Sequence, residues 1–143
     1  TPNLDWLVLT KRPENIKKML PSTWGTSWDN VWLGTTAENQ KWWDKRVPEL
    51  LKIPSRVHFV SMEPMLGPVE IGNDCAVDWI IVGGETGAEP KAFDPTWARD
   101  MRDKCGNLNI PFFFKQWGAR IPEGQVMKSL DGVKHKEFPA GKY

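Results

Sequence analysis

Trp79-Ile80-Ile81-Val82-Gly83-Gly84-Glu85-Thr86 is a short apolar run that stops abruptly at a polar cluster. The same pattern occurs four more times, with apolar runs at residues 6–9, 31–33, 57–60 and 112–114. The clusters that follow them are Thr10-Lys11-Arg12, Gly34-Thr35-Thr36, Ser61-Met62-Glu63-Pro64 and Lys115-Gln116-Trp117. Near-continuous apolar runs are typical of strands in a parallel sheet, because such strands are covered on both faces. We therefore expect a mostly parallel sheet of five strands.

Helix signals lie between most of these runs. Glu14 to Leu20 follows Pro13 and carries apolar residues at helical spacing. A second helix, capped by Thr36 and running to Leu51, should kink or break at Pro48. A third should begin at Asp94-Pro95 and end near Cys105, with Gly106 as its stop. This alternation predicts an α/β fold, a partial (β/α) barrel whose helices cover the sheet.

The chain of 143 residues is expected to form a single partial-barrel domain, with β/α units over residues 1–118 and an irregular tail over 119–143. Its net charge of +1 does not indicate a general grip on nucleic-acid backbone. We see no run long enough to span a membrane and no signal peptide, so we expect a cytoplasmic protein. Cys75 and Cys105 stand far apart, and we expect both to be reduced and neither to bind a metal.

Polar residues at the ends of consecutive parallel strands predict one ligand site, because the carboxyl ends of such strands meet at one edge. Lysine and arginine there suit a carboxylate or phosphate, and the diglycine lets backbone approach a ligand. The alternative is that the charges pair with one another, Lys115 with Glu63 or Glu85. The candidate ligand-binding residues are Lys11, Arg12, Thr35, Glu38, Asn39, Ser61, Glu63, Gly83, Gly84, Glu85, Lys115 and Gln116.

The sequence assigns no catalytic residue. His58 and His135 are the only histidines: the first is expected to be packed in a strand and the second to be solvated in the tail. Without a positioned histidine or cysteine pair, nucleophile–base catalysis has little support. Of the nine tryptophans, we expect most to fill the interface between sheet and helices, and single out Trp117 because it sits at a strand end.

Several of these blocks resemble a phage-associated family of uncharacterised proteins that has a three-cysteine motif and is itself similar to radical S-adenosylmethionine enzymes. The resemblance rests on residues 6–15, 33–40, 59–68, 79–87 and 111–118, which occur in the same order along nearly the whole chain. It implies a partial or full α/β barrel. It also implies that Gly83, Gly84, Glu85 and the strand end from Ser61 to Glu63 face an adenosylmethionine pocket.

The cysteine motif of that family would lie before Thr1, and this chain has only two cysteines. A four-iron cluster needs several positioned thiolates. We therefore expect no cofactor in this chain alone, and S-adenosylmethionine with an iron–sulfur cluster only where an N-terminal segment supplies the cysteines. The predicted function is the substrate-side portion of a radical S-adenosylmethionine-like barrel enzyme, and the alternative is a non-catalytic ligand-binding or assembly module.

The expected partners follow from the barrel strands that the chain lacks. Open sheet edges and apolar faces favour pairing with another chain. We expect self-association, most simply as a homodimer, or else an N-terminal segment or partner that completes the barrel. A third solution is that the tail from residue 118 folds back over the open face. A small-molecule ligand is also expected, and a membrane is not.

Overall fold

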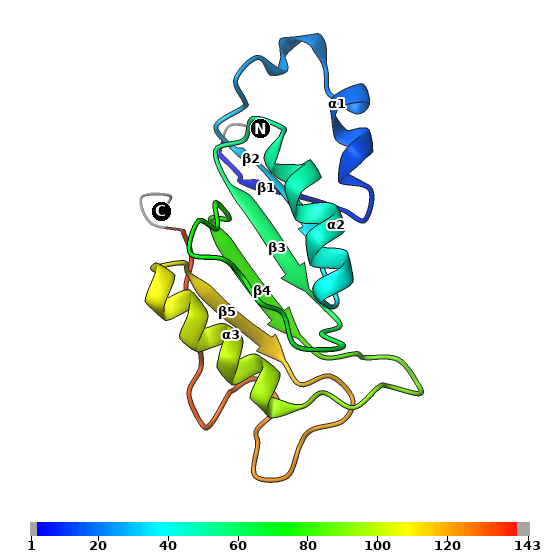
Figure 1. The fold of residues 1–143 in the computed structure, drawn as a ribbon, viewed down its shortest axis with the longest axis vertical. Coiled ribbons are helices and arrows are strands. Elements are labelled where there is room, and N and C mark those ends of the chain that lie inside the picture. The colour runs from blue at the N-terminus through cyan, green and yellow to red at the C-terminus, as the bar shows by residue number, and fades with distance from the viewer. Residues whose placement is uncertain (1–2, 140–143) are drawn as a thin grey trace.

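The computed structural model describes residues 3–139 and contains a five-stranded, all-parallel sheet (Figure 1). The strands are β1 (Trp6–Thr10), β2 (Val31–Thr36), β3 (His58–Met62), β4 (Trp79–Gly83) and β5 (Phe112–Gln116). They lie side by side in the order of the sequence, β1-β2-β3-β4-β5. The predicted α/β class and the five predicted strands are thus confirmed, and the sequential order is the one that (β/α) barrels use.

The segment after β1 is less helical than predicted. It consists of a 3-10 turn, η1 (Pro13–Asn15), a four-residue α1 (Ile16–Met19) and a second 3-10 turn, η2 (Ser22–Trp24). Pro21 limits α1, because the residue before a proline is disfavoured in the helical region. Leu20 is accordingly extended, with φ −71° and ψ 142°.

Helix α2 (Gln40–Leu51) corrects two predictions. Its cap is Asn39, whose side chain accepts a hydrogen bond from the Trp42 N–H, whereas Thr36 is the last residue of β2. Pro48 does not break the helix, which continues to Leu51. The buried Val47 and Leu50 pack into the core on either side of Pro48, and this packing offsets the hydrogen bond that proline cannot make.

Helix α3 (Pro95–Leu108) begins as predicted, because the Asp94 carboxylate accepts from the Thr96 N–H at 2.9 Å. Its predicted end is wrong: the helix includes Gly106 and continues to Leu108. Asn109 takes the left-handed conformation that ends it, with φ 55°. Asparagine tolerates this conformation, so the chain needs no glycine there.

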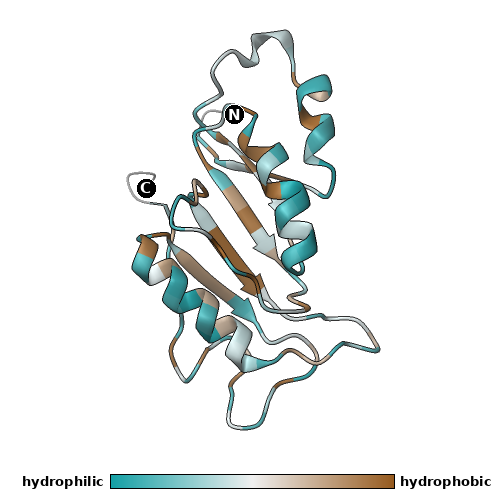
Figure 2. Cartoon of the chain, viewed as in Figure 1, coloured by the Kyte–Doolittle hydropathy of each residue, from teal (hydrophilic) through white to brown (hydrophobic). Residues whose placement is uncertain are grey.

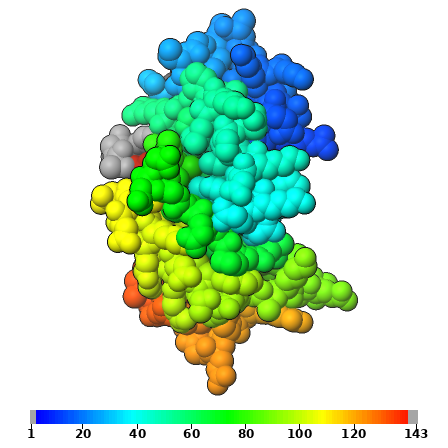
Figure 3. Space-filling model, viewed as in Figure 1, coloured from blue at the N-terminus to red at the C-terminus, as the bar shows by residue number. Residues whose placement is uncertain are grey.

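The two faces of the sheet are covered differently. Helices α2 and α3 lie against one face, where β3, β4 and β5 contribute the apolar core (Figures 1 and 2). In the space-filling view these two helices make up much of the visible surface (Figure 3). The other face has a cluster of its own around Trp32, Phe59 and Trp79. The Phe59 ring lies over Gly34, where a Cβ would come within 2.4 Å of it. Bulky side chains of the sheet itself therefore fill much of this face.

The tail covers the outer edge of β5. Lys136 forms an antiparallel bridge with Phe113, and the Phe114 N–H donates to the His135 carbonyl at 2.9 Å. Phe138 packs on the other face against Trp79, with ring centroids 5.2 Å apart. Residues 119–139 form neither helix nor strand, and residues 140–143 of the predicted tail lie outside the described residues. The tail thus covers part of the open face.

The prediction that His135 is solvated is wrong. Its ring packs edge-on against Phe112, with centroids 5.5 Å apart, and Nε2 is buried. Burial and the nearby Arg102 lower the pKa of His135. Within residues 3–139, no helix combines the length and the apolar character needed to cross a membrane.

Candidate functional site

The carboxyl ends of the five strands are aligned by the strand register. Thr10 pairs with Thr35, Thr36 with Ser61, and Gly83 with Gln116. Every candidate ligand-binding residue lies in the last residues of a strand or in the loop that follows it. We call this end of the sheet the carboxyl edge. The structure therefore brings the candidate residues to one edge, where they form two separate charged groups.

The first group surrounds Glu38. Lys11 Nζ lies 2.6 Å from Glu38 Oε1, and Arg46 Nη1 lies 2.8 Å from Glu38 Oε2. Arg46 Nη1 also donates to the carbonyl and the hydroxyl of Thr36. The guanidinium lies over the Trp42 ring, 3.9 Å from its centroid. The Glu38 and Arg46 side chains are each 8% exposed, so this is a buried ion pair with one partly exposed lysine at its rim.

The charge state of Glu38 follows from these neighbours. Burial by itself raises the pKa of Glu38. The hydrogen bond from Lys11, the backbone and the positive charge of Arg46 together outweigh burial and lower the pKa below its ordinary value. Glu38 is therefore a carboxylate at neutral pH, suited to hold cations and not to donate a proton.

The second group joins β5 to the end of β3. Lys115 Nζ lies 2.9 Å from Glu63 Oε2. The Glu63 side chain lies over Gly83, where a Cβ would come 3.3 Å from the Glu63 carboxyl carbon. Of the two pairings considered from the sequence, the structure has Lys115 with Glu63. Glu85 instead turns to its own loop, where it accepts from the Lys91 N–H at 2.9 Å. The Lys115 side chain is half-exposed, so this pair faces solvent.

Backbone of the chain itself fills the space beside Gly84, the second glycine of the diglycine. A Cβ on Gly84 would come within 1.9 Å of the Trp117 carbonyl oxygen. Gly118 has φ +84°, and a Cβ there would come within 2.2 Å of the Glu85 carbonyl oxygen. The Gly84 N–H donates to the Gln116 carbonyl and the Ala119 N–H to the Glu85 carbonyl. Gly84 and Gly118 therefore permit the loops after β4 and β5 to pack backbone against backbone at the carboxyl edge.

Other candidate residues have structural partners. The Thr35 hydroxyl donates to the Thr10 carbonyl at 2.9 Å, and Asn39 caps α2. Ser61 is buried, and its carbonyl accepts from the Ala37 N–H at 3.1 Å. Arg12 is exposed at the rim and Gln116 is partly buried. Trp117, which the sequence singled out, is buried, and its indole N–H donates to the Ser129 carbonyl.

Arg46 was missed from the sequence, although it is central to the first group. It lies on the apolar face of α2 together with Trp43, Val47 and Leu50. A charged residue inside an apolar helical stripe must find a buried partner. That signal, together with a carboxylate just before the helix, could have identified Arg46.

The described residues offer little to a metal. Residues 3–139 contain no group of three or more His, Cys, Asp or Glu side chains that could hold a metal ion. Cys75 and Cys105 are free thiols, Cys75 in the connection before β4 and Cys105 in the last turns of α3. Both positions precede the amino end of a strand, opposite the carboxyl edge. Burial raises the pKa of both thiols, that of Cys105 to about 12.

A family model described as a protein of unknown function, DUF5131, matches residues 1–139. The chain belongs to the DUF5131 family. No curated protein and no solved structure matches it. The predicted membership of an uncharacterised family is thus confirmed at this level, and the similarity to radical S-adenosylmethionine enzymes stays a prediction for this DUF5131 protein.

Proposed function

We propose that this DUF5131 chain binds a small charged ligand at the carboxyl edge, as the substrate-side portion of a radical S-adenosylmethionine-like barrel enzyme. The observation that carries the proposal is the pair of lysines at this edge, Lys11 after β1 and Lys115 within β5, each held by a recessed carboxylate. Parallel α/β sheets bind ligands at this end.

Size and charge support a ligand of nucleoside class. Four inter-strand spacings of about 4.8 Å separate β1 from β5, so the edge is long enough for such a molecule. S-adenosylmethionine carries an ammonium and a carboxylate, which complement Glu63 and Lys115 in charge. Together with an iron–sulfur cluster, S-adenosylmethionine supplies an organic radical.

The cluster itself does not fit this chain. Cys75 and Cys105 lie away from the carboxyl edge, and their raised pKa values disfavour the thiolate that iron requires. We therefore propose that any cluster is bound by cysteines outside residues 3–139, on a partner or another segment. This chain would bind and orient the ligand.

The experiment is a calorimetric titration of the chain with S-adenosylmethionine. Glu63→Gln should weaken binding roughly tenfold or more, because it removes a charge-assisted contact. Glu70→Gln is the matched control, since Glu70 also pairs with a lysine, Lys104 at 2.8 Å, but lies in the connection between β3 and β4. Equal losses in the two variants, or no binding by the unmodified chain, would count against the proposal.

The alternative is a non-catalytic ligand-binding or assembly module, and the ion pairs of the carboxyl edge favour it. Glu38 is bound by Lys11 and Arg46, and Glu63 by Lys115, so both groups are suited to recognise charge without taking part in a reaction. The two functions differ in their need for iron. After anaerobic incubation with iron, sulfide and reductant, retained iron and release of 5′-deoxyadenosine would favour the enzyme, whereas ligand binding without either would favour the module.

A further inference from the structure

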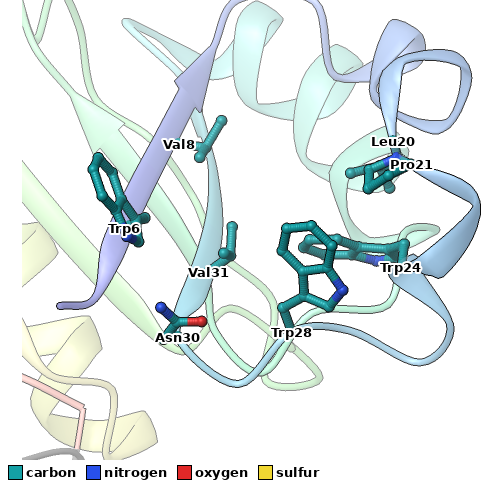
Figure 4. A pocket seen from close by; sticks show the side chains of 8 residues that line it. All are labelled: Trp6, Val8, Leu20, Pro21, Trp24, Trp28, Asn30 and Val31. Carbon is teal, nitrogen blue, oxygen red and sulfur yellow. The ribbon is translucent and has the colours of Figure 1, made fainter. Parts of the chain in front are cut away.

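Strand β1 lies at the edge of the sheet and is exposed on both faces. Trp6, Leu7, Val8 and Leu9 are between 45% and 50% exposed, although all four are apolar. On the helix-covered face, Trp6 and Val8 line a cavity of about 500 Å³ together with Trp24, Trp28 and Val31 (Figure 4). Apolar surface concentrated on one strand marks an interaction surface.

Within residues 3–139, no strand or bridge pairs with the outer backbone edge of β1. The Trp6 N–H donates to the Asn30 carbonyl at 2.8 Å, next to the Trp6–Val31 register pair. In a parallel ladder every second residue bonds to the same neighbour. Trp6, Val8 and Thr10 therefore turn their backbone groups to β2, and Leu7 and Leu9 turn theirs to the open edge.

We propose that β1 pairs antiparallel with β1 of a second copy of this chain, about a twofold axis at Val8, so that two five-stranded sheets become continuous. In this register Leu7 lies opposite Leu9 of the second copy, and the two exchange backbone hydrogen bonds. Val8 lies opposite Val8 of the second copy. The twofold axis stands perpendicular to the sheet, so the apolar faces of the two copies stay on the same sides.

Charge complementarity selects a second copy and this register. Asp5 precedes the strand and Lys11 follows it, so the register centred on Val8 places Asp5 opposite Lys11 of the second copy, twice. A two-residue shift would instead place Asp5 opposite Leu9, or Leu7 opposite Lys11. A one-residue shift would place Val8 opposite Leu7 or Leu9 of the second copy. The helix-covered face of one copy would then lie on the same side as the other face of the second copy. The Lys11 side chain is 60% exposed, and its ammonium has donors to spare beyond the one that Glu38 accepts.

The pairing reaches the carboxyl edge through Lys11. Lys11 already holds Glu38, and Asp5 of the second copy would lie beside the same ammonium. The interface is thus continuous with one of the two charged groups. An N-terminal segment that completed the barrel would pair with the same edge of β1, so such a segment and a second copy are alternative occupants. The two tests below, made on the chain of 143 residues, decide for or against the second copy.

The first test is cross-linking under mild oxidation. Val8→Cys should form an intermolecular disulfide, because a central non-hydrogen-bonded pair has Cα atoms about 4.5 Å apart. Leu7→Cys and Leu9→Cys are the controls, since each would lie roughly 8–9 Å from its own counterpart, too far for a disulfide. Cross-linking of Leu7→Cys or Leu9→Cys in preference to Val8→Cys would overturn the register. The unmodified chain controls for Cys75 and Cys105.

The second test is the molar mass in solution by light scattering over a concentration series. The unmodified chain should change from 16.4 kDa to twice that mass. Asp5→Lys should raise the dissociation constant roughly tenfold or more, because it places like charges opposite each other at two positions. Asp100→Lys, the same change at an exposed position on α3, should leave it unaltered. A mass of 16.4 kDa at every concentration, or a dimer insensitive to Asp5→Lys, would overturn the proposal.

Discussion

The two edge strands of the sheet are alike in sequence and unlike in surroundings. β1 and β5 are both short apolar runs that end at a lysine-containing cluster. Phe112 and Phe114 of β5 are buried under α3 and beside the tail, whereas residues 6–9 of β1 are about half exposed. The tail also occupies the outer backbone of β5, through the hydrogen bond from Phe114 to His135.

The comparison teaches that an apolar run does not reveal what covers it. Each edge also carries one lysine of the carboxyl edge, Lys115 in β5 and Lys11 just after β1. One lysine is therefore held by a strand fixed within the chain, and the other follows a strand whose outer side is open. Any occupant of β1 would also act on the Lys11–Glu38 pair.

The largest expected difference between the edges is in stability. Phe114→Ala should lower the free energy of unfolding by about 3–5 kcal/mol, because it leaves a cavity in the core. Val8→Ala should cost under about 1 kcal/mol at a protein concentration where the chain is monomeric, since half of Val8 already meets water. Urea denaturation of both variants measures this. Comparable losses would contradict the assignment of β1 as the open edge.

The second prediction compares the two lysine–carboxylate groups. Glu38→Gln should cost about 3 kcal/mol of unfolding free energy, because it leaves Arg46 buried without its charge partner. Glu63→Gln should cost under about 1 kcal/mol, because Lys115 is half-exposed and solvent screens the pair. Urea denaturation near neutral pH measures both losses. A larger loss for Glu63→Gln would contradict the conclusion that the Glu38–Arg46 pair contributes more to stability because it is buried.

The third prediction is the pH dependence of the same pair. The pKa of Glu38 is lowered in the folded chain, so its contribution is complete above its ordinary value of 4.5 and is lost as pH falls below that value. The difference in unfolding free energy between the unmodified chain and Glu38→Gln should therefore shrink between pH 7 and pH 3. A difference that stays constant over this range would show that Glu38 is not held as a carboxylate.

The smallest effect is expected where the tail is attached to α3. Arg99 binds both carboxylate oxygens of Asp131, and Arg102 contacts one of them. These contacts, with Gln125, hold the pKa of Asp131 well below its usual range. All are at the surface, so Asp131→Asn should cost no more than about 1 kcal/mol, and less at high salt. Thermal melts at two salt concentrations, with Glu123→Gln as the control in the same tail, measure this.

The sheet was predictable because each strand is a continuous apolar run bounded by turn residues. The helix ends were not, because they depend on competing local choices: Asn39 caps α2 in place of Thr36, and Asn109 ends α3 in place of Gly106. The break predicted at Pro48 does not occur, because tertiary packing outweighs a single missing hydrogen bond.

The candidate site was predictable in its location and less so in its connections. Strand ends identified the residues of the carboxyl edge, and the Lys115–Glu63 pair was one of two alternatives. The partner of Glu38 was not foreseen, because Arg46 comes from a helix face that the strand pattern does not describe. The cover of β5 was missed because the tail has no periodicity that predicts where it packs.

Amide hydrogen exchange tests the contrast between the two edges most directly. At high dilution the N–H groups of Leu7 and Leu9 should exchange rapidly, and their protection should rise with protein concentration as a second copy covers β1. The Phe114 N–H donates a hydrogen bond to the His135 carbonyl in the tail, so it should be protected at every concentration. Protection of Leu7 and Leu9 that does not depend on concentration, or rapid exchange at Phe114, would contradict the account.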